Sequence, residues 1–316
     1  MKFLNPLFDC LSPSGARARL SVLIFHRVLD EPDTLFPDEM HARRFNEVCG
    51  WLAAWFNVLP LDEAIALMKV GDLPARSACI TFDDGYEDNY RVAMPILQRH
   101  HLTATFFIAT EFLDGGYMWN DALIESVRSS ELPILDLSSL NLGCYVLKTI
   151  EDRRSTVAAL IDQMKYLQLE ERAVLSQRIA GLAGVTAPHN VMMTSNEVKL
   201  MRSAGMQIGA HTINHPILAR LTDEQAEKEI KGSKDFLEQL LGERVGLFAY
   251  PNGKPVEDYT PQSVEVVRRL DFDAAVSTQW GTSSMQDDFF QVRRFTPWDK
   301  TRMRFGARLL NNLAKR

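Results

Sequence analysis

The feature that most constrains the fold is a repeated alternation of short apolar segments with longer amphipathic ones. The pattern predicts buried strands at 20–26, 77–82, 104–109, 206–210, 245–250 and 272–276. It predicts helices at 42–56, 62–70, 90–100, 195–204, 223–241, 261–270 and 301–316. This alternation is typical of α/β proteins, in which helices connect the parallel strands of a sheet or barrel.

One stretch, from 120 to 191, interrupts the alternation. Its periodicity predicts helices, including much of 151–182, and no clean strand. A chain of 316 residues fits a single α/β barrel that carries such an insertion. We therefore expect one domain over 1–316, with a mainly helical insertion at 120–191.

Composition limits the partners and the location of the chain. The net charge of −6 and the pI near 5.7 exclude a general nucleic-acid binder, which needs a basic surface. The four cysteines form no CxxC pair, the N-terminus lacks an apolar signal segment, and no run approaches the roughly 20 apolar residues of a membrane span. We expect a cytoplasmic protein. Basic residues of the last segment could hold it to anionic lipid: Arg302, Arg304, Arg308, Lys315 and Arg316.

Two histidines follow the predicted strand at 206–210. His211 and His215 are four residues apart, and on a helical turn that spacing places both imidazoles on one side, where they can reach one metal ion. The alternative is ordinary polar packing. The pair therefore needs an independent partner before it indicates a metal site.

Two adjacent carboxylates, Asp83 and Asp84, provide that partner. They follow the predicted strand at 77–82, and the carboxyl ends of strands are where α/β barrels carry their catalytic groups. One carboxylate can complete a His-His-carboxylate metal site, while the other accepts a proton from water. A helix N-cap followed by a turn is the alternative explanation of the same pair.

Three short motifs resemble those of a known family. They are Thr81-Phe82-Asp83-Asp84-Gly85, His211-Thr212-Ile213-Asn214-His215 and Tyr250-Pro251-Asn252-Gly253. The chain resembles the polysaccharide deacetylases, the carbohydrate esterases of family 4 that share the NodB homology domain. This resemblance spans roughly residues 20 to 296 apart from the insertion. It implies a distorted (β/α) barrel, usually of seven strands, a divalent metal that is often zinc, and hydrolysis of an acetamide on a sugar.

The resemblance also implies a role for each matched residue. Asp83 would be the general base, and Asp84, His211 and His215 would hold the metal. The backbone N–H of Asn252, just after the proline, would stabilise the oxyanion. A plain turn is the alternative explanation of this last motif.

The chain departs from the family pattern at two points. Ala249 stands where the family usually has an arginine two residues before the proline, and the histidine of the last motif, the usual general acid, is not found. Arg293 or Arg294 could orient Asp83 instead. The alternative explanation of each arginine is an ordinary solvated charge on the surface. His26, at the end of the first strand, is the best remaining candidate for the acid. The alternative explanation is that His26 has only a structural role, hydrogen-bonded at the end of the strand.

These features predict a metal-dependent hydrolase that removes acetyl groups from an N-acetylated glycan or a lipid-linked sugar. One alternative is a related hydrolase of O-acetyl or formyl groups. The altered motifs suggest a second alternative, a catalytically weak glycan-binding protein.

Overall fold

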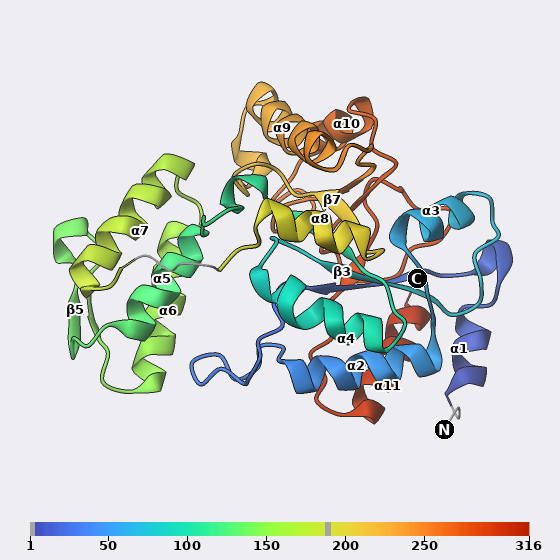
Figure 1. The fold of residues 1–316 in the computed structure, drawn as a ribbon, viewed down its shortest axis with the longest axis horizontal. Helices are drawn as coiled ribbons and strands as arrows, with labels where there is room; N and C mark the ends of the chain where they lie inside the picture. Colours follow the sequence, from blue (N-terminus) through green and yellow to red (C-terminus); the bar gives the residue numbers. More distant parts are fainter. Residues whose placement is uncertain (1–3, 187–190, 316) are drawn as a thin grey trace. The chain divides into compact units, whose positions relative to one another are not determined.

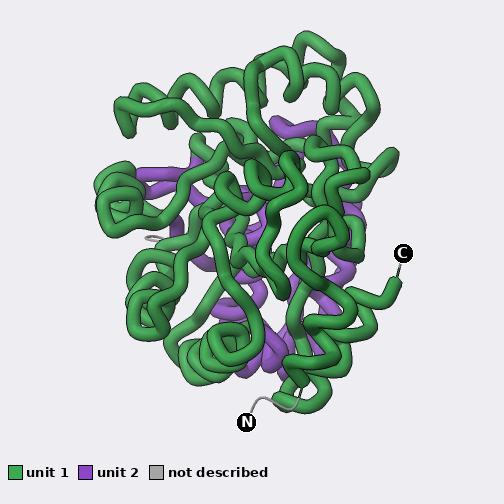
Figure 2. Tube along the Cα trace, turned by 90° about the vertical axis from the view of Figure 1, so that its right-hand side faces the viewer, with its two compact units in different colours: residues 1–31, 40–111, 193–316 green, residues 32–39, 112–192 purple. Residues whose placement is uncertain are grey.

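The structure is a computed structural model that describes residues 4–186 and 191–315 (Figure 1). The chain divides into two compact units, coloured green and purple in Figure 2. The first unit comprises Met1–Glu31, Met40–Glu111 and Met193–Arg316, and the second comprises Pro32–Glu39 and Phe112–Met192. The segment 120–191, expected to be an insertion, falls within the second unit.

The first unit is built on a parallel β-barrel. Its seven principal strands are β1 (Ser21–Phe25), β3 (Ser77–Phe82), β4 (Thr105–Ile108), β7 (Gln207–Ala210), β8 (Leu247–Ala249), β9 (Ala274–Val276) and β10 (Arg294–Phe295). They pair in the order β10-β1-β3-β4-β7-β8-β9, and every pairing is parallel. A parallel bridge between Val276 and Val292 joins β9 to the chain just before β10, so the sheet nearly closes on itself. The short strand β2 (Asn57–Val58) pairs with the start of β3.

Helices lie before, between and after the strands of this barrel. They are α1 (Asn5–Leu11), α2 (Ala42–Trp55), α3 (Leu61–Lys69), α4 (Met94–Arg99), α8 (Ser195–Ser203), α9 (Asp223–Leu241), α10 (Pro261–Arg269) and α11 (Arg302–Ala314). Helix α1 precedes β1, α11 follows β10, and the others connect strands from β1 to β9. The longest, α9, starts with a capping box in which the Thr222 hydroxyl accepts a hydrogen bond from the Gln225 N–H. It ends at Gly242, whose left-handed backbone is the usual way to end a helix.

The barrel strands read as continuous apolar runs because they are covered on both faces. All residues of β1 and β3 are buried, as expected for parallel strands between an interior and a layer of helices. One buried hydrophobic cluster includes residues from five strands: Val22, Cys79, Phe107, Leu247, Ala249, Ala274 and Val276. Burial of this cluster fixes the register that brings the polar strand ends to the same edge.

The second unit has its own hydrophobic core. It contains α5 (Trp119–Ser129), α6 (Ile150–Met164), α7 (Leu169–Ala183) and a hairpin of β5 (Ile134–Asp136) and β6 (Cys144–Val146). Buried residues from the helices, the hairpin and the 32–39 segment share this core, among them Leu35, Leu123, Leu135, Leu160 and Ile179. The unit is mainly helical, with a short antiparallel hairpin that the apolar periodicity did not predict.

The expected (β/α) barrel fold is confirmed, and it has seven principal strands. All six predicted strands are present, with ends shifted by two residues at most, whereas β10, β2 and helix α1 were not predicted. The helix predicted at 90–100 begins as a π-helical turn at Asn89–Ala93 and continues as α4. Within 4–186 and 191–315, no helix combines the length and apolar character that a membrane crossing requires.

Candidate active site

The two neighbouring carboxylates lie where β3 ends. The Asp83 N–H still donates to the Phe25 carbonyl oxygen of β1, 3.0 Å away, so Asp83 continues the sheet. Asp84 then adopts a left-handed backbone, with φ of 78°, and Gly85 follows with φ of 94°. Left-handed backbone is uncommon outside glycine, and here it ends the strand between two adjacent acidic residues. Their side chains therefore contact different partners.

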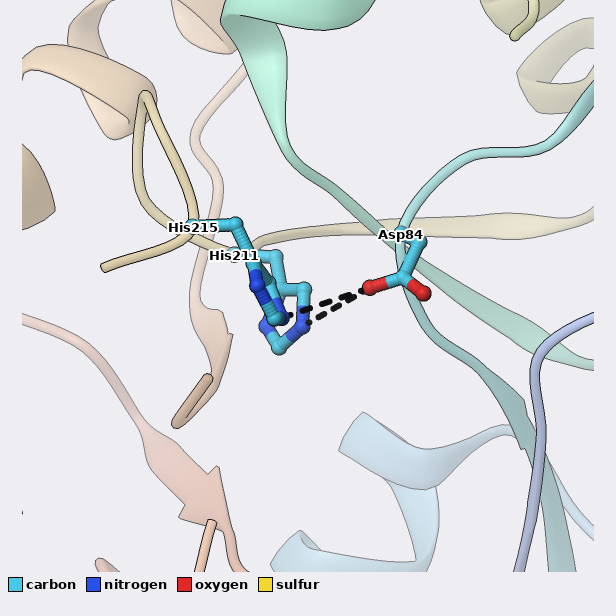
Figure 3. Close-up of side chains that lie close together, drawn as sticks. All are labelled: Asp84, His211 and His215. Carbon is cyan, nitrogen blue, oxygen red and sulfur yellow. Dashed lines mark ion pairs between the residues drawn. The ribbon is translucent and has the colours of Figure 1, made fainter. Parts of the chain in front are cut away.

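Asp84 faces the two histidines that follow β7 (Figure 3). Its Oδ1 lies 3.4 Å from Nε2 of His211 and 3.4 Å from Nε2 of His215. One nitrogen or oxygen atom from each of the three residues lies within 4.8 Å of the others. Three protein donors of this kind are typical of a catalytic zinc site, in which water or substrate takes the fourth position.

The hydrogen bonding of Asp84 and His211 fits a cation at this point. Within the described ranges, no donor forms a regular hydrogen bond to Oδ1 of Asp84, although the atom is buried. The Nδ1–H of His211 donates to the Ala249 carbonyl oxygen at the end of β8, 2.8 Å away. In the neutral ring, that bond leaves Nε2 with the lone pair a metal requires, and it fixes the orientation of the ring.

The charge states of these groups suit the same role. Burial by itself raises the pKa of Asp84, but the two histidines and His26 lower it below its usual value. Burial lowers the pKa of His215 to about 4, so this ring is neutral at pH 7. Burial also lowers the pKa of His211, but the charges of Asp83 and Asp84 outweigh it and raise the pKa. The cluster therefore combines one anionic oxygen with a neutral imidazole and a second imidazole held among negative charges.

Asp83 instead forms an ion pair with Arg294 of β10. The guanidinium donates from both terminal nitrogens to the two carboxylate oxygens, each at 2.7 Å. It also donates to the Ser277 carbonyl oxygen and to the Thr81 hydroxyl, at 2.9 and 3.1 Å, and Arg294 is completely buried. Burial, the largest single effect, raises the pKa of Asp83, but the charge and hydrogen bonds of Arg294 together with the charges of His211 and His26 outweigh it and lower the pKa. Asp83 is thus held anionic in a fixed, two-pronged geometry.

Only one of the two candidate arginines contacts Asp83. Arg293 points elsewhere, with its guanidinium 3.3 Å from the Thr282 carbonyl oxygen and 3.3 Å from the Asp287 carboxylate. Its side chain is 33% exposed. The sequence left Arg293 and Arg294 equivalent, and the structure brings Arg294 alone to the carboxylate.

The Pro-Asn-Gly turn follows β8 directly. Asn252 has a left-handed backbone with φ of 57°, and its carbonyl oxygen accepts a hydrogen bond from the Thr278 hydroxyl at 2.7 Å. At Gly253, with φ of 76°, a Cβ would lie 2.9 Å from the Thr278 nitrogen, so only glycine fits. The Asn252 N–H has no acceptor in the described part of the chain. This free donor stands three residues after Ala249, whose carbonyl oxygen holds His211.

His26 lies one residue beyond β1, the neighbour of β3. Its backbone carbonyl oxygen accepts a hydrogen bond from the Asn89 amide at 2.8 Å, which fixes the chain at this point. The side chain is exposed. Its charge contributes, after larger effects, to lowering the pKa of both Asp83 and Asp84.

The sequence did not point to two further groups at this site. Thr81 orients Arg294 through its hydroxyl, and its position was a usable signal, because residues two apart on a strand share a face and Thr81 precedes Asp83 by two. The Ala249 carbonyl oxygen holds His211 through the main chain. Only the pairing of β7 with β8 reveals this second contact.

Comparison with known proteins identifies the family of this chain. A sequence profile described as polysaccharide deacetylase matches residues 70–132 and 174–275, just over half of the chain. The chain therefore belongs to the polysaccharide deacetylase family.

The relatives are distant in sequence. YxkH of Bacillus subtilis is 19% identical over 279 residues, which cover 88% of this chain and 71% of that protein. The poly-β-1,6-N-acetyl-D-glucosamine N-deacetylase of Staphylococcus epidermidis is 23% identical over 205 residues, covering 64% and 70% respectively. The structure of the Streptococcus pyogenes deacetylase PplD in complex with acetate superposes with a TM-score of 0.62 at 18% identity, covering 94% of this chain and 99% of that one. At such identity the superposition establishes a common fold.

Proposed function

We propose that this protein is a zinc-dependent hydrolase that removes acetyl groups from an N-acetylated glycan. The observation that carries the proposal is the meeting, at the ends of the barrel strands, of an Asp-His-His donor cluster and a separately oriented carboxylate. A bound divalent metal would polarise the acetyl carbonyl and make water more acidic. Asp84, His211 and His215 would hold it.

The remaining roles follow from charge and hydrogen bonding. Asp83 is anionic and fixed by Arg294, so it accepts the proton of the attacking water. The free N–H of Asn252 donates to the oxygen that becomes negative as the carbonyl is attacked. His26, exposed just after β1 and thus beside the end of β3, gives a proton to the departing amine.

The substrate class rests on family membership and on one relative. The Staphylococcus epidermidis protein is named for a β-1,6-linked N-acetylglucosamine polymer, which supports an N-acetylated hexosamine as substrate here. A lipid-linked sugar remains a narrower version of the same proposal. The alternative of a catalytically weak glycan-binding protein loses part of its basis, because Arg294 supplies the contact that Ala249 cannot make.

Acetate release tests the proposal. The purified protein, stripped of metal and supplied with one equivalent of Zn²⁺, should release acetate from β-1,6-linked N-acetylglucosamine oligomers. Asp83→Asn should release it about 10²-fold to 10⁴-fold more slowly. Faster turnover of matched O-acetyl or N-formyl sugars would favour the related hydrolase. Bound Zn²⁺ without turnover of any of these sugars would favour the glycan-binding alternative and refute the proposal.

A separate proposal concerns the C-terminal helix, α11. Met303 is 69% exposed and Arg304 beside it is also exposed, whereas Arg308 pairs with Asp299. Arg316 lies outside the described residues. We propose that Met303 and Arg304 contact anionic lipid from the cytoplasmic side. Cosedimentation with phosphatidylglycerol vesicles should fall in a Met303→Glu, Arg304→Glu variant, and unchanged cosedimentation would refute the contact.

A further inference from the structure

The loop that carries both histidines has an unfavourable backbone. Thr212 has φ of 66° and His215 has φ of 51°, so two of its five residues are left-handed. This conformation is rare for a branched residue such as threonine, and it persists only when the surrounding contacts determine it. Something must therefore hold the loop in place.

A single carboxylate on α9 holds the middle of this loop. Oε2 of Glu229 accepts hydrogen bonds from the N–H groups of Ile213 and Asn214, at 3.0 and 2.8 Å. Oε1 accepts one from the Asn214 side-chain amide at 2.8 Å. Glu229 is only 9% exposed, so these bonds form away from bulk water, where bonds to a charged acceptor are strong.

The other side of the loop is fixed as well. The carbonyl oxygens of Thr212 and Ile213 accept hydrogen bonds from the N–H groups of Thr110 and Glu111, at 3.2 and 3.1 Å. These residues follow β4, which pairs with β7 along its length. The barrel thus holds the loop carbonyls, and among the residues that the structure describes only Glu229 of α9 accepts from the N–H groups of Ile213 and Asn214.

The same face of α9 also leaves room for the loop. Gly232 lies in the middle of the helix, where glycine is unfavourable relative to alanine, so its presence needs a reason. A Cβ at Gly232 would lie 2.5 Å from Cδ1 of Ile213. Glu229 and Gly232 are one turn apart, so one strip of α9 binds the Ile213 backbone and admits its side chain.

We propose that Glu229 and Gly232 form a seat on α9 that positions His211 and His215 toward Asp84. Glu229 is a positioning residue, because it contacts the backbone between the two histidines and not the cluster itself. The inference rests on the proposed function, because it assumes that the two histidines bind a metal ion whose affinity the seat sets.

The test is the affinity of metal-stripped protein for Zn²⁺, measured by competition with a chromophoric chelator. Glu229→Ala removes all three acceptor contacts and should weaken Zn²⁺ binding by about 10-fold to 100-fold. Glu229→Gln can retain these contacts if the Asn214 amide turns over, so it should recover most of the affinity. Glu224→Ala, an exposed glutamate on the same helix, is the control and should leave affinity unchanged.

A second pair of variants covers the case in which Glu229→Ala does not fold. Gly232→Ala should also weaken Zn²⁺ binding, because the new methyl group displaces Ile213. Gly181→Ala is the matched control, since a Cβ at this helical position meets nothing within 4 Å. The absorption spectrum of bound Co²⁺ should change in Glu229→Ala or Gly232→Ala and in neither control.

The outcomes separate this inference from the function on which it rests. Wild-type affinity and an unchanged Co²⁺ spectrum in folded Glu229→Ala or Gly232→Ala, with only a lower melting temperature, would overturn the seat and leave the proposed function standing. A wild-type protein that binds no Zn²⁺ would overturn the proposed function itself.

Discussion

Replacing Arg294 by methionine should separate the orientation of Asp83, the proposed base, from the binding of metal. Arg294 is completely buried and makes four hydrogen bonds, two of them to Asp83, which is itself 2% exposed. Methionine fills much of the same volume but leaves a buried carboxylate without its cation. Breaking a buried ion pair in this way costs about 3–5 kcal/mol, out of a total stability of roughly 5–15 kcal/mol. The unfolding equilibrium should shift by about 160-fold to 5,000-fold.

The loss should depend on pH in a defined direction. In the native protein the pKa of Asp83 is lowered, so its contribution to stability is full above the unfolded pKa and is lost as pH falls through the folded one. Without Arg294 the effect of burial dominates and raises the folded pKa above the unfolded one. The Arg294→Met variant should then lose stability as pH rises between these two values. The difference between the two proteins should therefore be larger at pH 7 than at pH 4.

Urea unfolding of the metal-free proteins at both pH values measures this difference. Zn²⁺ affinity, measured separately, should stay within a few-fold of wild type, because Arg294 contacts none of the three proposed ligands, while turnover falls. Asp83→Asn, Arg294→Met should be less destabilised than the sum of its single changes, because neither charge is left buried alone. A stability loss under about 1 kcal/mol that is the same at both pH values would refute this account of the pair.

Three further predictions address other residues of the site. Asp84→Asn should lower Zn²⁺ content, with activity partly restored by excess metal, whereas Asp83→Asn should keep its metal and lose about 10²-fold to 10⁴-fold in turnover; equal metal loss in both would contradict these roles. His26→Gln should slow acetamide hydrolysis but spare 4-nitrophenyl acetate, whose leaving group needs no proton, and equal losses on both would exclude the acid role. Gly253→Ala should cost about 1–2 kcal/mol or more in urea unfolding, because φ of 76° is strained for alanine and the new Cβ would meet a backbone nitrogen at 2.9 Å. Gly184→Ala, at a φ of 70° with open space around it, should lose less.

The sequence could predict the fold and the Asp-His-His cluster because short local patterns carry both. Each of the six predicted strands is a mainly apolar run, buried throughout except at the first residue of β7, and the barrel brings their carboxyl ends to one edge. Asp83, Asp84, His211 and His215 each lie just after such a run. The ends of β3 and β7 are close in space, because only β4 lies between these two strands in the sheet, although they are far apart in the sequence.

Strand β10 could not be predicted from the same patterns. It has only two residues, and one of them is Arg294, whose charge interrupts any apolar run. The choice between Arg293 and Arg294 depends on which of two alternating faces points into the barrel, and a two-residue strand gives no periodicity from which to tell. Only the register of Val22 with Arg294 and of Leu23 with Phe295 decides it.

The position of Arg294 makes the orientation of Asp83, the proposed base, depend on closure of the barrel. β10 pairs with β1 on one side, and the Val276–Val292 bridge just before it joins β9 on the other. From this closing strand Arg294 reaches Asp83 on β3, 211 residues earlier in the chain, and also bonds the Ser277 carbonyl oxygen just after β9. In the motif of other family members the corresponding arginine would stand at Ala249, on the strand that holds His211. Here Asp83, the proposed base, is held by one end of the sheet, and the Asp-His-His cluster is held by its middle. Loosening β10 should therefore impair turnover before it impairs metal binding.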